Sequence, residues 1–183
     1  MIFRGTDTMA ILLEWIIARM VLRPDIQSKL QFEIESVVGK TRSVCDSDLP
    51  NLPYLQNCCQ GNPSNAPSRP TSLLAITHNE RVWFEPNEFK PKRFLEDDVA
   101  IMGSDLKLAP FGLGRRVCPG KAIGLAIVQL WLGQMLQSFK WVASDGGVDL
   151  SEVLKLSMEM KNPLVCKAVA RVSSNSCFGC VAL

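Results

Sequence analysis

The chain has 183 residues, of which 47% are hydrophobic and 21% charged, a composition typical of a globular protein and not of a disordered one. That length is enough for one domain. The formal net charge of +2 gives no argument for nucleic-acid binding.

The first predicted element is a long helix over about residues 2–20. Its apolar residues recur at three- and four-residue steps, the period of a helix: Ile2, Met9, Leu12, Leu13, Ile16 and Met20. Within it lies the polar stretch Arg4-Gly5-Thr6-Asp7-Thr8. Glycine and threonine are poor helix-interior residues, and a threonine hydroxyl can bond a backbone carbonyl and open a local groove. Taken alone, the stretch is better explained as a polar helix face.

A turn at residues 23–25 leads to a second amphipathic helix near residues 26–38, and residues 39–56 are expected to form a loop with a short helical piece. Residues 57–72 show no helical periodicity and are punctuated by prolines, so we expect an irregular segment. The simplest interpretation of that segment is a surface linker. Short helices are expected around residues 79–82 and 91–94.

The segment from Phe111 to Gly120 places one cysteine among three glycines, two arginines and a proline. Proline favours the first position of a helix, so we expect Cys118 at or beside the N-cap of a helix near residues 121–139. Free backbone N–H groups and the helix dipole would then favour the thiolate, the form that binds metals. The glycines would let a flat cofactor approach, and Arg115 and Arg116 could bind its carboxylates. The alternative is a buried structural cysteine.

From residue 142 onward we expect strands and turns, with residues 156–160 pairing with residues 164–169. Residues 172–183 read as a tail that contains Cys177 and Cys180 in a Cys-x-x-Cys spacing. No second ligand pair accompanies them, so a small zinc or redox protein is the weaker interpretation. Seven cysteines without a compact disulfide spacing favour a reducing compartment.

The cysteine segment fits Phe-x-x-Gly-x-Arg-x-Cys-x-Gly, the haem-ligand loop of the cytochromes P-450, position by position. Residues 4–8 resemble the oxygen-activation motif of that family, and residues 89–94 resemble its Pro-Glu-Arg-Phe segment, with Lys92 in place of glutamate. Residues 1–171 therefore resemble a partial catalytic domain, the C-terminal part of a plant microsomal cytochrome P-450. The resemblance implies a mainly α fold with small β elements, incomplete, that contains the central long helix, the cysteine loop and the helix after it.

The resemblance also implies a haem-dependent monooxygenase that inserts one oxygen atom of O2 into a small hydrophobic organic substrate. Cys118 would be the axial ligand of the iron of haem b, and Asp7 and Thr8 would deliver protons. The implied cofactor-binding residues are Phe111, Gly112, Arg116, Cys118 and Gly120. Arg116 would bind a haem propionate, and Phe111 would pack near the sulfur.

Partners and location follow from the same resemblance. Electrons would come from NADPH-cytochrome P-450 reductase. A full-length relative would lie on the cytosolic face of the endoplasmic reticulum membrane, held by an anchor that we do not find in this chain. No nucleic-acid partner is expected.

Residues 57–72 depart from the family, which has a helix with a Glu-x-x-Arg pair there. Permitted codons for these residues can be read one nucleotide later as Thr-Val-Val-Lys-Glu-Thr-Leu-Arg-Met-His-Pro-Pro-Gly-Pro-Leu, which restores that helix. We therefore expect a frameshift followed by a deletion, or an equivalent gene-model or splicing error. Arg93 would lose its carboxylate partner, which is destabilising for a buried guanidinium. The alternative to the enzyme is thus a non-catalytic, truncated pseudogene-like product.

Overall fold

A computed structural model describes residues 2–60, 111, 115, 117–155, 158–171 and 181–182. Four helices lie in these ranges, with one 3-10 helix: α1 (Ile2–Leu22), α2 (Pro24–Val37), η1 (Asp46–Asn51), α3 (Pro53–Gln60) and α6 (Lys121–Ser138). The strands are β1 (Phe139–Ala143), β2 (Glu152–Leu154), β3 (Met158–Met160), β4 (Val165–Ala170) and β5 (Val181–Ala182). None of the described helices is long and apolar enough to cross a membrane.

The predicted helices over residues 2–20, 26–38 and 121–139 are confirmed as α1, α2 and α6, with ends shifted by one or two residues. Pro24 occupies the start of α2, where its missing N–H group is tolerated. Gly39 ends α2 with φ 80°, a backbone conformation that glycine adopts easily. The expected short helices at residues 79–82 and 91–94 lie outside the described residues.

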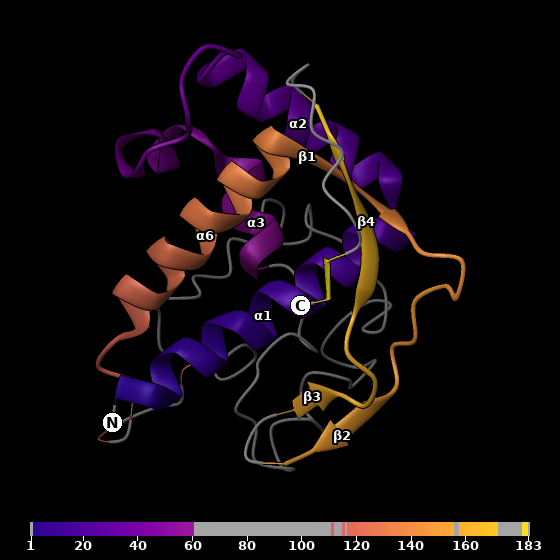
Figure 1. The fold of residues 1–183 in the computed structure, drawn as a ribbon. Coiled ribbons are helices and arrows are strands. Elements are labelled where there is room, and N and C mark those ends of the chain that lie inside the picture. Colours follow the sequence, from indigo (N-terminus) through magenta and orange to yellow (C-terminus); the bar gives the residue numbers. More distant parts are fainter. Residues whose placement is uncertain are drawn as a thin grey trace, which may run out of the picture.

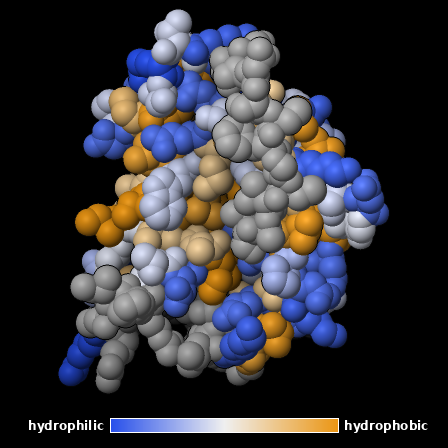
Figure 2. Space-filling model, viewed as in Figure 1, coloured by the Kyte–Doolittle hydropathy of each residue, from blue (hydrophilic) through white to orange (hydrophobic). Residues whose placement is uncertain are grey.

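The core forms where α1 packs against α2, α6 and β1 (Figure 1). The second half of α1 contributes Trp15, Ile16, Ile17 and Met20, all 1% exposed or less. Leu30 and Ile34 of α2 are fully buried in the same cluster. Only one side of α6 packs into this core. Because the helix is apolar on most of its surface, apolar residues on its other side stay exposed, Ile123 at 70% and Trp131 at 41%. Figure 2 shows hydrophobic residues at the surface along this helix.

The strand pairing differs from the sequence prediction. β4 pairs antiparallel with β1, with Trp141 opposite Ala168, and β3 pairs antiparallel with β2. We had expected residues 156–160 to pair with residues 164–169; this is wrong for Met158–Met160, which pair with β2. Long-range bonds to α1 explain the difference, because the Trp15 indole N–H donates to the Met158 carbonyl at 3.2 Å and Glu14 accepts the Leu164 N–H at 2.9 Å. The tail also takes part, since β5 pairs with the start of β4.

The prediction that residues 57–72 are irregular is wrong for its first four residues, which continue α3 to Gln60. Two causes are visible. Glu33 of α2 accepts the N–H groups of Tyr54 at 2.8 Å and Leu55 at 2.9 Å, and so caps α3 from outside. Cys58 and Cys59 behave as small apolar residues and are buried. Residues 61–72 lie outside the described residues.

Candidate functional site

Cys118 lies in a turn that closes just before α6. Its N–H donates to the Phe111 carbonyl at 2.9 Å, and its own carbonyl accepts the Lys121 N–H at 3.4 Å. The N-cap of α6 is Gly120, with φ −90° and ψ 10°, so Pro119 is not the first helical residue. Cys118 therefore lies two residues before the N-cap, and not at or beside it. The preceding turn, rather than the cap itself, determines where its backbone lies.

The thiol of Cys118 is accessible. Cys118 is a free, exposed cysteine, and the exposed Val117 precedes it. Phe111, at the other end of the turn, is half-buried and packs against the core. The loop is thus anchored at Phe111, while Cys118 itself is exposed. Gly112 and Arg116 lie outside the described residues, so their predicted contacts with a cofactor stay predictions.

The other predicted site residues lie in the first half of α1. Gly5, Thr6 and Asp7 are exposed and Thr8 is half-buried. The helix is continuous through this stretch, from Ile2 to Leu22. It packs against α6, and in Figure 1 both helices begin on the same side of the molecule. Residues 4–8 thus lie in the first half of α1 and Cys118 lies directly before α6, and these two helices are in contact.

The remaining described cysteines have different surroundings. Cys58, Cys59 and Cys166 are buried, and burial raises the pKa of the Cys58 and Cys59 thiols well above the ordinary value. Cys45 is half-buried, and its Sγ lies 3.1 Å from an Asp48 carboxylate oxygen. In the part of the chain that the structure describes, no group of three or more His, Cys, Asp or Glu residues is placed to hold a metal ion. Cys177 and Cys180 lie outside that part.

The residues present fit a haem group. Haem needs one axial sulfur ligand from the protein, not a cluster, and it needs that sulfur accessible to a large flat ring. Cys118 meets both requirements, because its side chain is exposed and its backbone is held by hydrogen bonds within the turn. By the same reasoning, the buried thiols of Cys58 and Cys59 do not.

Two residues of α6 that were not predicted from the sequence, Gln134 and Gln137, hold the helix to a distant loop. Their side-chain amides bond the backbone of residues 39–44, far away in sequence. A signal was present, because α6 is otherwise mostly apolar and the two glutamines are spaced to project from one side of it.

The family model for cytochrome P450 matches residues 1–60 and 71–166. The chain is 52% identical over 198 residues to cytochrome P450 78A5 of Arabidopsis thaliana, in an alignment that covers 93% of this chain and 38% of that protein. It is 36% identical over 204 residues to the beta-amyrin 24-hydroxylase of Glycine max, covering 93% of this chain and 40% of that protein. The chain thus spans less than half the length of these curated relatives.

Solved structures agree. A zebrafish cytochrome P450 solved with abiraterone superimposes with a TM-score of 0.76 at 25% identity, over 91% of this chain and 45% of that one. A zebrafish cytochrome P450 solved with progesterone gives a TM-score of 0.73 at 25% identity, over 92% and 43%. The helices and small sheets described above are therefore part of the cytochrome P450 fold. The chain belongs to the cytochrome P450 family.

Proposed function

We propose that this chain carries the haem-thiolate centre of a monooxygenase that inserts one oxygen atom of O2 into an organic substrate. The observation that carries the proposal is the exposed thiol of Cys118, in a turn closed by the bond between the Cys118 N–H and the Phe111 carbonyl. The name of the relative beta-amyrin 24-hydroxylase supports hydroxylation as the reaction class. A small hydrophobic substrate is in keeping with that name.

In this proposal Cys118 would hold the iron of haem b through its thiolate. Haem, when bound, would supply the redox chemistry that activates O2. Phe111 would pack beside the sulfur, Gly112 and Gly120 would let the backbone approach the ring, and Arg116 would bind a propionate through its forked N–H donors. On α1, Asp7 and Thr8 hold and pass protons, a role for which the exposed Asp7 carboxyl and the Thr8 hydroxyl are suited.

The partners and the location belong to the same proposal. The electron donor is NADPH-cytochrome P450 reductase, and the complete enzyme is attached to the cytosolic face of the endoplasmic reticulum membrane. The support is the likeness to plant members of the family. A flavoprotein reductase is the chemical class that can deliver electrons one at a time from NADPH.

The test is a haem titration of the purified 183-residue chain, followed by reduction and addition of carbon monoxide. We expect the red-shifted Soret band of a thiolate-ligated haem. Cys118→Ser should remove that band, whereas the matched control Cys45→Ser should keep it, because Cys45 lies in a different loop. A band that survives Cys118→Ser would overturn the assignment of the ligand.

A second candidate, a non-catalytic product of the same gene family, has support of its own. The family match is interrupted at residues 61–70, within the segment that departs from the family pattern. The alignment with cytochrome P450 78A5 is 198 residues long, longer than the whole chain, although it holds only 93% of it. That relative therefore has residues without a counterpart here, as a deletion would leave them.

Sequencing the transcript tests this second candidate. Codons across residues 57–72 that restore the Glu-x-x-Arg helix when read one nucleotide later would support a frameshift. Codons that destroy the shifted reading would exclude it. The two candidates make different spectroscopic predictions, because a non-catalytic chain need not produce the thiolate band described above.

A further inference from the structure

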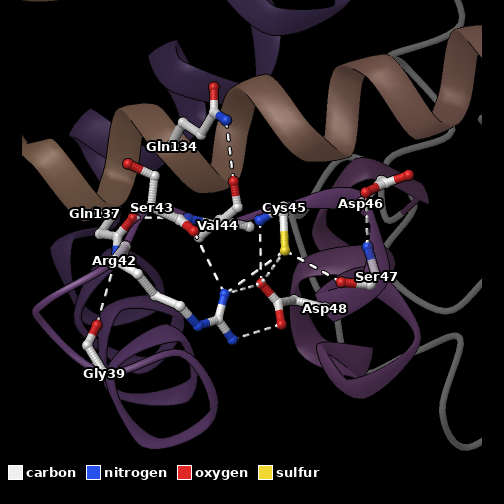
Figure 3. Close-up of polar contacts among 10 residues, drawn as sticks. All are labelled: Gly39, Arg42, Ser43, Val44, Cys45, Asp46, Ser47, Asp48, Gln134 and Gln137. Carbon is white, nitrogen blue, oxygen red and sulfur yellow. Dashed lines mark hydrogen bonds and ion pairs between the residues drawn. The ribbon is translucent and has the colours of Figure 1, made fainter.

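Side-chain amides in the second half of α6 form hydrogen bonds with the backbone of the loop between α2 and η1. The Val44 N–H donates to Gln137 Oε1 at 3.0 Å, and the Val44 carbonyl accepts from Gln134 Nε2 at 3.0 Å (Figure 3). Two glutamines three residues apart on one helix thus bind both polar backbone groups of a single loop residue. Such a match determines which residue of the helix faces which residue of the loop.

Gln137 adds two bonds to this attachment. Its Nε2 donates to the Arg42 carbonyl at 2.7 Å and to the Gly39 carbonyl at 3.3 Å. Its amide therefore uses its oxygen and both N–H groups on the same loop. The Val44 side chain, 1% exposed, lies over Gly133 of α6, where a Cβ atom would be 3.3 Å from Val44 Cγ1. The backbone of α6 and the loop can approach this closely because residue 133 lacks a side chain.

The loop is itself held in one conformation. Arg42 donates to both carboxylate oxygens of Asp48, at 2.6 and 2.8 Å, and the Cys45 N–H donates to Asp48 Oδ2 at 3.0 Å. The Arg42 guanidinium holds the pKa of the Asp48 carboxyl well below its usual range. At neutral pH the ion pair is therefore intact, and the loop offers a fixed set of carbonyl and N–H groups to α6.

We infer that Gln134 and Gln137 are positioning residues for Cys118, which lies at the opposite end of α6; the inference rests on the proposed role of Cys118 as the haem ligand. A helix is stiff along its axis, so fixing its last turns against the loop also fixes its first turn. Slippage by one residue moves a helix by about 1.5 Å. A ligand site tolerates displacements of only about 0.5 Å. The glutamines determine the position of the thiol by preventing such slippage.

The test uses hydrogen–deuterium exchange on the full chain. It compares two sites at which glutamine side chains bond both the N–H and the carbonyl of one residue. The test variant is Gln134→Leu with Gln137→Leu. The matched control is Gln27→Leu, because Gln27 also bonds both backbone groups of one residue, Trp141, at 2.8 and 3.0 Å, but joins α2 to β1 and not the loop to α6. Both variants lose buried or half-buried amide bonds, so both should be less stable.

The double variant is expected to raise exchange at residues 117–125 at least about tenfold above that of the control, because the glutamines no longer keep α6 from sliding along its axis. Acceleration confined to residues 130–138, or equal in both variants, would overturn the inference. Gln137→Glu, which keeps the acceptor for the Val44 N–H and loses the two donors, should fall between wild type and the double variant. That single change keeps the test decisive if the double variant does not fold.

A second readout separates this inference from the proposed function. In reduced, carbon-monoxide-treated samples, the double variant should show a smaller fraction of thiolate-ligated haem than Gln27→Leu at equal haem loading. If wild type takes up no haem, the proposed function fails while the exchange experiment still decides whether α6 is held from its far end. If wild type binds haem through Cys118 and both variants show equal thiolate fractions, the inference fails and the proposed function stands.

Discussion

The two longest helices, α1 and α6, each begin with exposed residues and are buried on one side further along. In α1, Gly5, Thr6 and Asp7 are exposed, whereas Ile16 and Ile17 are 0% exposed. In α6, Ile123 is 70% exposed near the start, whereas Leu125, Val128, Leu132 and Leu136 are buried on one side of the helix from its second turn onward. In both helices the residues tied to chemistry lie at or before the exposed start.

In each helix the exposed start is available for chemistry, and the residues buried further along provide the packing. Residues that must meet a cofactor or substrate need accessible side chains, so they contribute little to the apolar core. The residues buried further along each helix hold the helices together. In α1 this burial begins at Leu13, two turns after the exposed Asp7, and in α6 it begins at Leu125, one turn after the start.

The largest expected effect tests this division directly. Leu132→Ala removes a fully buried side chain from α6 and should lower the free energy of unfolding by about 2–5 kcal/mol. Ile123→Ala, at an exposed position in the first turn of the same helix, should change it by about 0.5 kcal/mol or less. Urea unfolding followed by circular dichroism measures both. Equal effects at the two positions would break the comparison.

Two glycines of α6 provide a second test, in which the same substitution should have opposite signs. Gly133→Ala places a Cβ 3.3 Å from Leu55 Cδ2 and Val44 Cγ1, and should destabilise by about 1 kcal/mol after the gain in helix propensity is subtracted. A Cβ at Gly124 meets nothing within 4 Å, so Gly124→Ala should stabilise by up to about 1 kcal/mol. Thermal unfolding of both variants checks the signs. A gain in stability for Gly133→Ala would mean that α6 is loosely packed against Leu55 and Val44.

A third prediction concerns the cap that α2 provides for α3. Glu33→Leu removes the acceptor for the Tyr54 and Leu55 N–H groups and should destabilise by about 1 kcal/mol. Glu33→Gln keeps one acceptor oxygen and should lose less. Urea unfolding ranks the two variants. If leucine and glutamine have the same effect, the cap does not hold α3, and the burial of Cys58 and Cys59 is sufficient.

The smallest expected effect is the pH dependence of the Arg42–Asp48 pair. Because the pKa of Asp48 is lowered on folding, the pair stabilises the fold above the ordinary aspartate pKa of about 4. That contribution is lost as the pH falls through the folded-state pKa. The difference in melting temperature between wild type and Asp48→Asn should therefore be largest near neutral pH and shrink in strong acid. A difference independent of pH would show that the hydrogen bonds, and not the charge, matter.

The sequence predicted the helices well and the strand pairing poorly. The apolar repeats of α1 and α6 determine helices by themselves, since burying one face requires no knowledge of the partner. The partners of β3 and β4 depend on α1, because the Trp15 indole N–H donates to the carbonyl of Met158 in β3 and Glu14 accepts the N–H of Leu164, just before β4. Short strands have little pattern of their own, so contacts from a distant helix decide their partners.

The candidate site likewise has features that could be predicted from the sequence and features that could not. Cys118, Asp7 and Thr8 could be singled out because their motifs are local in sequence. The position of Cys118 relative to the N-cap could not, because the turn from Phe111 to Cys118 leaves the cysteine two residues before Gly120. The role of Gln134 and Gln137 depends on a loop about ninety residues earlier, and no local pattern reveals such a partner.

The central claim, that Cys118 binds haem, is tested most directly by alkylation of the wild-type chain with and without haem, read by mass spectrometry. Cys118 is exposed and Cys45 half-buried, so both should react in the absence of haem, while the buried Cys58 and Cys59 react slowly. We predict that haem protects Cys118 strongly and leaves the rate at Cys45 unchanged. Equal rates at Cys118 with and without bound haem would contradict the assignment.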